Sequence, residues 1–389
     1  MNEFIKRIVP ADRLSGERPW ATRIDWILFL AFFLIVCAGL VTMNSFVGDN
    51  SFFERQIMWA PISIIFFFLI SFIDFRFLRR TEVVVTLLIV IVTFLLALLA
   101  LGITVKGAQS WFNFGGISFE PADLAKIILV ILLAKYFSRR HIEIANVRHI
   151  LVSGAYSFIL FALIVLQPDF GSAIIIFCIW LGMVLVSGIS KKHLLVVFLG
   201  AIIIFGVLWN FGFKDYQKQR IMTFIHPLSD IRGVGYNVWQ STIAFGSGEL
   251  WGKGIGYGTQ SKLKFLPEYQ TDFIFAAFAE EWGFFGVIIL FGLYGVVIWR
   301  ILVNSFHGAT NFEILFGLGV ATYIASHFII HVGMNIGLLP VTGIPLPFMS
   351  YGGTHLLMES TALGILMGMR GYAKTAHKDL VHNEFIGPV

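Results

Sequence analysis

The sequence has little charge and very little cysteine for its length. Of its 389 residues, 13% are Asp, Glu, Lys or Arg, against about 25% in an average soluble domain. Its two cysteines, Cys37 and Cys178, both lie inside apolar runs, which excludes a disulfide framework and a thiolate metal site. Hydrophobic residues make up 57% of the chain, more than a water-soluble core can bury, so we predict an integral membrane protein.

The positive net charge of +5 does not indicate a nucleic-acid-binding protein. The basic residues fall in short clusters between apolar runs, which is the spacing that the positive-inside rule gives to cytoplasmic loops. These charges therefore orient the chain in the membrane, and no nucleic-acid partner is expected. The clusters are Arg76, Arg79 and Arg80; Arg139 and Arg140; and Lys191 and Lys192.

Ten apolar segments are long enough to cross a bilayer, which takes about 20 mainly apolar residues in a helix. The sequence therefore predicts an all-α polytopic membrane protein with about ten transmembrane helices, in a domain from 26 to 370. A leader, 1–25, and a tail, 371–389, flank this domain. The first apolar run is too long for a signal-peptide core and is expected to stay as an anchor. The segments lie near 26–46, 57–73, 82–104, 122–138, 151–167, 171–189, 193–212, 272–301, 312–334 and 355–370.

Both termini are expected in the cytoplasm, because a cytoplasmic leader then puts every basic cluster on one side. The outer face receives four segments rich in Gly, Pro, Gln, Asn and Trp. The largest of them, a loop between the seventh and eighth spans, carries seven Lys or Arg. Long loops translocate largely regardless of charge, and cations on this face favour an anionic ligand. The four segments are 106–121, 167–171, 213–271 and 338–354.

A stretch with four carboxylates, FLPEYQTDFIFAAFAEEWGFFG (265–286), begins the eighth predicted span. Asp272 could cap this helix. It could equally act as a general base at the membrane interface, since cations and aromatic residues crowd the same face. Glu280 and Glu281 lie roughly 12–14 Å further along a helix. They could lie on a proton path or line a polar cavity, or they could form a structural pair that is hydrogen-bonded to neighbouring helices, and the structural pair is favoured.

A second polar stretch is KGAQSWFNFGGISFEPADLAKI (106–127). Asp123 falls in the first turn of the next helix, where the helix dipole stabilises a carboxylate. Lys126 lies one turn further into the membrane, where it could pair with Asp123 at i,i+3 or contact a lipid headgroup phosphate. The other charges around the candidate outer-face cavity are Arg55, Asp169 and Arg220.

Two further motifs are given structural interpretations. The run GKGIGYG (252–258) is similar to a phosphate-binding loop, but no strand–turn–helix unit is expected in an outer loop, so its glycines are predicted to form tight turns. His327, His331 and Asn335 recur at i, i+4 and i+8 on one helical face. A metal pair and polar contacts between helices are both open there, and the polar contacts are favoured.

Four of these segments resemble the motifs of one family. LPEYQTDFIFAAFAEEWG (266–283) resembles its signature around TDFIFA, and QPDFG (167–171) resembles its QPD turn. GLLPVTGIPLPFMSYGG (337–353) resembles its SYGG loop, and KGAQSWF to FEPADLAK (106–126) resembles its segment from GAxRW to FQPSELAK. From about residue 55 to 370 the chain is therefore similar to the SEDS family (shape, elongation, division and sporulation) of polytopic cell-wall polymerases. GTQSKLKFLPE (258–268) is more similar to its rod-elongation members than to its division members.

The resemblance implies a ten-helix peptidoglycan glycosyltransferase of the bacterial inner membrane. It would polymerise lipid II into glycan strands on the periplasmic face during elongation and rod-shape maintenance. Its implied partners are a class B penicillin-binding protein and other elongation-complex proteins. Asp272 is implied as the catalytic carboxylate. The implied substrate-contacting residues are Arg55, Asp123, Lys126, Asp169 and Arg220, to which the outer-face charges add Lys106 and Glu268.

The sequence departs from the family pattern at a few positions. Ser110 stands where GAxRW has Arg, Asp123 shortens the acidic side chain of FQPSE, and Glu120 adds a charge. His331 replaces an Asn, and Glu249 replaces a Gly. These departures affect the expected phosphate contacts and leave Asp272 unchanged.

The implied chemistry agrees with the residue types. The acceptor's sugar hydroxyl is a weak nucleophile, and a carboxylate within hydrogen-bond reach takes its proton as it attacks. Asp272 would act in this way in a direct displacement that inverts the anomeric carbon. A Mg²⁺ or Mn²⁺ ion bridging the carboxylate and the pyrophosphate is compatible with the sequence, which requires no cofactor and predicts no metal-ligating residues.

Other functions stay open at this point. A transporter that flips lipid II would also use intramembrane carboxylates and a cation-lined cavity, although the internal repeats typical of transporters are not evident. A division-type polymerase of the same family is a second alternative. A non-catalytic scaffold would leave the outer-face charges without a role.

Overall fold

The computed structural model describes residues 24–45, 51–105, 108–114, 117–138, 147–188, 191–226, 233–263 and 265–383. Within them, each of the ten predicted segments corresponds to a helix, and seven helices are long and apolar enough to cross a membrane. The other three are α7, which is shorter, and α5 and α14, which are more polar. The prediction of an all-α membrane protein is confirmed. The helices are α2 (Trp26–Asn44), α3 (Ser51–Ser71), α4 (Thr81–Leu101), α5 (Pro121–Ser138), α6 (Val147–Leu166), α7 (Phe170–Val186), α8 (Lys191–Val207), α12 (Ile274–Phe306), α13 (Asn311–Asn335) and α14 (Gly353–Asn383).

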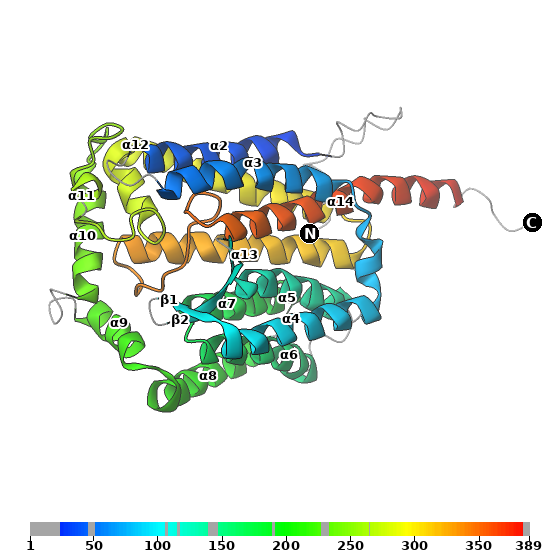
Figure 1. The fold of residues 1–389 in the computed structure, drawn as a ribbon. Helices are drawn as coiled ribbons and strands as arrows, with labels where there is room; N and C mark the ends of the chain where they lie inside the picture. Colours follow the sequence, from blue (N-terminus) through cyan, green and yellow to red (C-terminus); the bar gives the residue numbers. More distant parts are fainter. Residues whose placement is uncertain are drawn as a thin grey trace, which may run out of the picture.

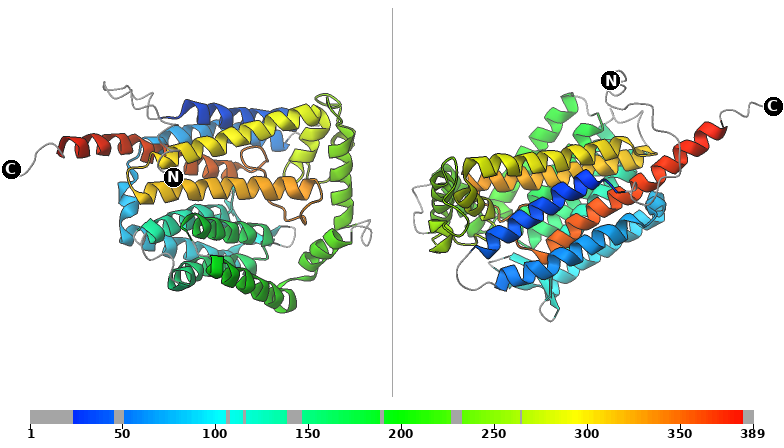
Figure 2. Two further views of the ribbon diagram at one scale, coloured as in Figure 1. Left: turned by 180° about the vertical axis from the view of Figure 1, so that it is seen from behind. Right: turned by 90° about the horizontal axis from the view of Figure 1, so that it is seen from above.

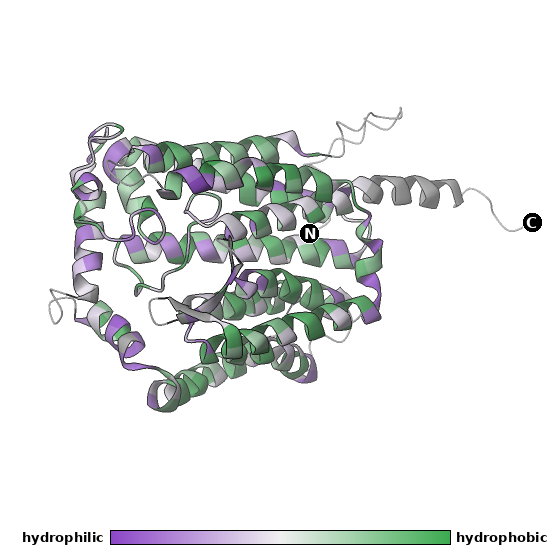
Figure 3. Ribbon diagram, in the orientation of Figure 1, coloured by the Kyte–Doolittle hydropathy of each residue, from purple (hydrophilic) through white to green (hydrophobic). Residues whose placement is uncertain are grey.

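The long helices lie side by side in one bundle (Figures 1 and 2). α13 packs against α5, α7 and α12, while α14 lies along α3 and α12 lies along α2. α5 and α13 are buried on nearly all sides, so they form the centre of the bundle. Apolar residues cover most of the helical surface, and polar residues gather at the helix ends (Figure 3). Exposed apolar side chains on α8, such as those of Leu195, Phe198 and Ile203, therefore face lipid.

At one end of the bundle, called the Asp25 end, the buried carboxylate of Asp25 links α2 to α12. Asp25 Oδ1 caps α2 by accepting the amides of Ile27 and Leu28, both at 3.2 Å. Its Oδ2 accepts from Arg300 Nε at 2.8 Å and from Asn304 Nδ2 at 2.7 Å on α12. Burial opposes ionisation, but Arg300 and Asn304 hold the pKa of Asp25 below its usual value.

The opposite end, called the Asp272 end, carries more structure than a loop. Between α8 and α12 the chain forms a π-helical turn, η3 (Leu208–Gly212), and three short helices across the end of the bundle (Figure 1). The segment between α4 and α5, also expected as a loop, pairs into three antiparallel strands in the order β1-β2-β3. These elements are α9 (Asp215–Ile225), α10 (Val234–Ser247), α11 (Thr259–Lys262), β1 (Ile103–Val105), β2 (Ala108–Phe114) and β3 (Ile117–Phe119); a 3₁₀ turn, η2 (Phe75–Arg79), lies at the Asp25 end.

Three of the helices differ from the prediction in ways that bear on the candidate site. α3 begins at Ser51 rather than near 57, so Arg55 lies in the helix and not in a loop. α14 continues to Asn383, beyond the predicted end at 370. The eighth span is divided, because Gly283 has non-helical angles (φ 64°, ψ −168°) inside α12. The predicted leader, up to residue 23, lies outside the described residues.

Loop 248–254 fills the break in α12. Its amides donate to the carbonyls of Glu280 and Glu281, both at 3.0 Å, and its carbonyls accept from the amides of Phe284 and Phe285, at 2.9 and 3.2 Å. The two chains approach so closely that a Cβ on Gly252 would lie 2.2 Å from the carbonyl oxygen of Glu281, and one on Gly283 would lie 2.2 Å from the nitrogen of Gly252. Glycine at both positions is therefore required by the crossing of the two backbones.

Candidate active site

The main chain around Asp272 is held by hydrogen bonds from two other segments. Three successive carbonyls accept a bond each: that of Gln270 from the Tyr351 amide at 2.9 Å, that of Thr271 from Ser350 Oγ at 2.7 Å, and that of Asp272 from Asn335 Nδ2 at 2.9 Å. A side chain on so constrained a backbone has few positions available to it. Asp272 is therefore a positioned carboxylate.

Asp272 does not occupy the cap position of α12, which corrects one of the two interpretations given above. The helix begins at Ile274 with Phe273 at the N-cap position. The free amide of Ala276 is satisfied from another helix, by Asn335 Oδ1 at 3.1 Å. A tertiary contact thus supplies the cap that the sequence assigned to Asp272.

The polar face of α13 holds the loop that follows it. His331 Nδ1 donates to the Ile344 carbonyl at 2.7 Å, and His327 Nδ1 lies 3.3 Å from the Pro345 carbonyl. Asn335 makes the predicted polar contact with another helix, through the Ala276 amide of α12, whereas His327 and His331 bind carbonyls of the loop instead.

Gly343 brings Asp272 together with Arg220, which lies on α9. A Cβ on Gly343 would lie 3.6 Å from Asp272 Oδ2 and 3.9 Å from Arg220 Nη1, so the carboxylate and the guanidinium border the same small space. Gly343 has φ +74°, a backbone conformation that suits glycine. Three segments far apart in the sequence therefore converge here, and an anion could contact the guanidinium beside the carboxylate.

The turn with Asp169 lies against the same loop. Asp169 Oδ1 caps α7 by accepting the Ser172 amide at 3.0 Å. A Cβ on Gly171 would lie 2.8 Å from the Thr342 carbonyl oxygen, which places the turn next to the chain around Gly343. Gln217 Nε2 on α9 donates to the Pro168 carbonyl at 3.3 Å. The turn therefore joins α7 and α9 at the edge of the candidate site.

Asp123 and Lys126 form an ion pair inside the bundle. Lys126 Nζ lies 2.8 Å from Asp123 Oδ1, and each side chain is 2% exposed. His355 Nδ1 on α14 lies 3.0 Å from the same oxygen. Of the two interpretations of Lys126, pairing at i,i+3 is thus the one observed.

Glu120, just before α5, lies between this ion pair and the Asp169 turn. Ser172 Oγ donates to Glu120 Oε1 at 3.3 Å. Burial, reinforced by the negative charges of Asp123 and Asp169, raises the pKa of Glu120 to about 8. The charge that FEPAD adds to the family pattern therefore stands where the ionised form of the carboxyl is disfavoured.

The remaining predicted site residues differ in how closely they approach Asp272. Arg55 is exposed on α3; its neighbour Gln56 is buried, donates to the Ser350 carbonyl at 3.3 Å and accepts the Gly352 amide at 3.2 Å. Arg55 therefore stands at the Asp272 end of α3. Glu268 is exposed, and its Oε2 accepts from Thr271 Oγ1 at 3.2 Å. Lys106 lies outside the described residues.

Glu280 and Glu281 hold the segment before α12. Glu280 Oε1 accepts from Lys253 Nζ at 2.7 Å and from the Gln260 amide at 3.0 Å. Glu281 Oε1 accepts the Gly256 amide at 3.0 Å and the hydroxyl of Ser45. Both carboxylates are therefore hydrogen-bonded, as the favoured interpretation predicted, but the predicted partners were wrong: the folded loop, and not neighbouring helices, supplies most of the donors.

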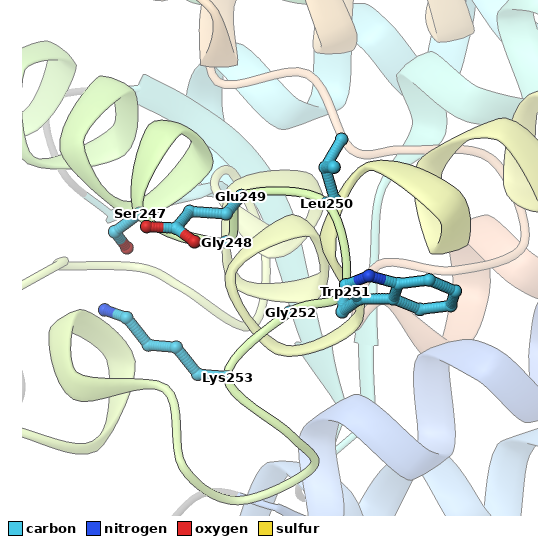
Figure 4. A pocket seen from close by; sticks show the side chains of 7 residues that line it. All are labelled: Ser247, Gly248, Glu249, Leu250, Trp251, Gly252 and Lys253. Carbon is cyan, nitrogen blue, oxygen red and sulfur yellow. The ribbon is translucent and has the colours of Figure 1, made fainter.

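A hollow of about 360 Å³ lies in this folded loop and is lined by Ser247–Lys253 (Figure 4). Glu249 and Lys253 extend toward one side of it and Trp251 toward the other. Gly252, with φ +80°, is one of three glycines here that have positive φ and form tight turns, as predicted. The lining includes none of the residues around Asp272.

Sequence reasoning missed the residues that support Asp272. Asn335 was noticed for its spacing, but a cap supplied by another helix leaves no local pattern. His355 and Glu359 were placed in an apolar span, 355–370. Ionisable residues in such a span are a usable signal, because they are rare there and face the bundle interior.

Comparison with known proteins gives consistent matches along almost the whole chain. The model of the family FTSW_RODA_SPOVE, described as cell cycle protein, matches residues 20–375. The peptidoglycan glycosyltransferase MrdB of Escherichia coli (strain K12) is 33% identical over 91% of this chain and 95% of its own. The probable peptidoglycan glycosyltransferase FtsW of Haemophilus influenzae is 32% identical over 94% and 95%.

A solved structure shares the fold. It is a chain in a structure on the coordination of polymerization and crosslinking by a peptidoglycan synthase complex. It superposes with a TM-score of 0.76 at 28% identity, covering 91% of this chain and 99% of that one.

Proposed function

Because the chain belongs to the FtsW/RodA/SpoVE family of cell cycle proteins, we propose that it is a peptidoglycan glycosyltransferase that polymerises lipid II, with Asp272 as its catalytic carboxylate. The observation that carries the proposal is the pairing at Gly343, where the Asp272 carboxylate and the Arg220 guanidinium border one space. A base and a cation for the leaving group are what glycosyl transfer from a pyrophosphate needs.

In the proposed reaction, Asp272 acts as general base. It accepts the proton of the acceptor's sugar hydroxyl as the hydroxyl oxygen attacks the anomeric carbon of the donor. The bond from that carbon to the pyrophosphate oxygen breaks, and undecaprenyl pyrophosphate leaves with the electron pair. A single displacement of this kind inverts the anomeric configuration. The three hydrogen bonds to the carbonyls of residues 270–272 support this role. They hold the backbone in place, so little conformational entropy is lost when the carboxylate contacts the hydroxyl.

Arg220 is proposed to neutralise the departing pyrophosphate, since a guanidinium binds phosphate oxygens in a forked geometry. Arg55, Lys106, Glu268 and Asp169 are proposed as further substrate contacts at the same end of the bundle. Asp123 and Lys126 are proposed to act from the interior of the bundle, because both side chains are buried and form an ion pair. A Mg²⁺ or Mn²⁺ ion at Asp272 would take its other ligands from pyrophosphate oxygens and water. Among the described residues, no three His, Cys, Asp or Glu side chains are grouped to hold a metal ion.

The Asp272 end is proposed to face the periplasm, with both termini in the cytoplasm. The basic turn η2 lies at the Asp25 end, the side that the positive-inside rule assigns to the cytoplasm. Lipid II has a membrane-anchored tail, so its pyrophosphate would stand at headgroup level. Asp272 and Arg220 form a site at one end of the bundle, which suits a substrate whose pyrophosphate stands at that level.

Gly343→Ala is expected to lower the polymerisation rate about tenfold or more, because its methyl group enters the space between Asp272 and Arg220. The matched control is Gly337→Ala in the same loop. Gly337 has a similar φ, +77°, but a Cβ there would meet Thr242 Oγ1 at 3.7 Å and Val238 Cγ1 at 3.9 Å, away from the site. Rates would be measured on purified protein with labelled lipid II. Equal losses in the two variants would mean that backbone strain, not the site, causes the effect.

We further propose a role in elongation, on the similarity of GTQSKLKFLPE (258–268) to rod-elongation members. Expressed with its own class B penicillin-binding protein, the chain is expected to restore rod shape to cells depleted of their elongation member of the family. Cells depleted of the division member should stay filamentous. Microscopy of both strains measures this, and rescue of division without rescue of shape would reverse the assignment.

A lipid II transporter is the second candidate, and the buried ionisable side chains between α5 and α14 favour it. Detergent micelles separate the two functions, because they offer no second compartment. A polymerase makes glycan strands from lipid II in micelles. A transporter makes none, and moves lipid II across liposome membranes instead.

A further inference from the structure

Four ionisable side chains form a buried series of contacts between α5 and α14, beneath the turn 346–350. Lys126 Nζ lies 2.8 Å from Asp123 Oδ1, and His355 Nδ1 lies 3.0 Å from that oxygen. His355 Nε2 lies 3.0 Å from Glu359 Oε1, one helical turn along α14, in an ion-pair contact rather than a hydrogen bond. All four residues are at most 4% exposed.

The charges of these four side chains balance when His355 is protonated. Two cationic groups then alternate with two carboxylates, and no charge is left without an opposite neighbour. Removing one member of such a buried set leaves an uncompensated charge in a medium that solvates it poorly. The arrangement therefore holds α14 and α5 in one relative position.

Glu359 also fixes the backbone of the turn above it. Its second oxygen, Oε2, accepts the Phe348 amide at 2.8 Å. Phe348 has φ +63°, a left-handed conformation that is unfavourable for a residue with a side chain. Its ring packs edge-on against Phe32 of α2, with the ring centroids 5.0 Å apart. The strained turn thus depends on the carboxylate beneath it and the ring beside it.

The turn 346–350 also positions the main chain next to Asp272. Ser350 Oγ accepts the Leu346 amide at 2.8 Å and donates to the Thr271 carbonyl at 2.7 Å. An unbroken series of contacts therefore leads from the buried ion pair on α5, through His355 and Glu359, to the residue before Asp272.

We propose that His355 and Glu359 are positioning residues for the reaction at Asp272: Glu359 holds the turn 346–350 through the Phe348 amide, and His355 ties Glu359 to the Asp123–Lys126 pair. The expected effect on turnover rests on the proposed function, whereas the expected effect on the backbone around Asp272 does not. Neither residue touches the substrate. Both act by fixing where the Asp272 carboxylate stands.

The test compares Glu359→Leu, which removes both the charge and the acceptor, with Glu359→Gln, which keeps an oxygen for the Phe348 amide. The control is Ser360→Ala on the same helix. Ser360 is fully buried, and its Oγ has no hydrogen-bond partner among the described residues. Amide hydrogen exchange by mass spectrometry would be followed in peptides covering 270–273 and 346–351, alongside turnover and KM for lipid II.

Glu359→Leu is expected to raise exchange in both peptides and to lower turnover about tenfold or more, with KM within about twofold. Glu359→Gln should retain most of the protection and most of the turnover, because His355 can lose its proton and leave Asp123 paired with Lys126. Ser360→Ala should match the wild type.

Unchanged exchange at 270–273 in a folded Glu359→Leu protein would overturn the proposal. So would equal losses in Leu and Gln variants, since these would show that the oxygen bonded to Phe348 is unimportant. A wild type that makes no strands would instead refute the proposed function, and the exchange data would still decide the positioning role.

Discussion

Asp272→Asn is expected to lower the rate of glycan-strand formation about a thousandfold, within the 10²–10⁴ range typical of general acid–base catalysis. The amide is nearly the same size as the carboxylate but does not accept a proton from the attacking hydroxyl. KM for lipid II should change little, because Arg220 and the other cations remain. The measurement is the steady-state rate of purified protein on labelled lipid II.

The variant should stay folded, because the bonds around Asp272 use its backbone. The Asp272 carbonyl accepts from Asn335, and the amide of Ala276 is capped by the same Asn335, whichever side chain stands at 272. Asp74→Asn is the matched control. It also removes one carboxylate, from an exposed position at the Asp25 end, where Asn can still cap η2. A rate for Asp272→Asn close to that of this control would exclude the general-base role.

Lys126→Met is expected to destabilise the protein by about 3–5 kcal/mol, the cost of removing one partner from a buried ion pair. Without Lys126, the buried series keeps two carboxylates and a single cation, His355. Met fills a similar volume, so packing contributes little to the loss. Equilibrium unfolding of wild type and variant in mixed micelles would measure the difference.

The double variant Asp123→Leu/Lys126→Met separates the ion pair from a direct role in phosphate binding. Because it removes both charges, it should recover much of the stability that Lys126→Met loses. A lysine that binds pyrophosphate at the surface would behave otherwise. Lys126→Met would then leave stability unchanged and raise KM for lipid II, and that pattern would contradict the buried position described above.

Seven of the ten helices were predictable because apolar length alone specifies a span. A run of about 20 apolar residues has no stable alternative to a helix in lipid, where backbone groups must pair within the segment. The same logic does not apply at the Asp272 end, where water and tertiary contacts compete. There the sequence predicted loops, and the chain forms strands β1–β3 and helices α9–α11.

The division of α12 could not be predicted from its own sequence. Its apolar pattern continues through Gly283, and the hydrogen bonds that make the break tolerable come from loop 248–254, some thirty residues earlier. Long-range pairing of this kind is invisible to a local pattern. For the same reason the sequence placed Glu280 and Glu281 inside the membrane, where the structure has them bound to the folded loop.

Much of the candidate site followed from residue type, and its assembly did not. Asp272 and Arg220 were named for their charges and for the family motifs, yet only the fold brings both to Gly343. Lys126 and Asp123 are the exception, because i,i+3 spacing on a helix already places them together. The supports supplied by Asn335 and Glu359 depend on contacts between helices that no spacing specifies.

The measurement that tests the account most directly is gel electrophoresis of the products formed from labelled lipid II. Wild type, Asp272→Asn and Asp74→Asn would be compared, each purified together with the proposed partner, a class B penicillin-binding protein. The account predicts a ladder of glycan strands from the wild type and from Asp74→Asn, and none from Asp272→Asn. Strands of similar amount and length from Asp272→Asn would contradict it.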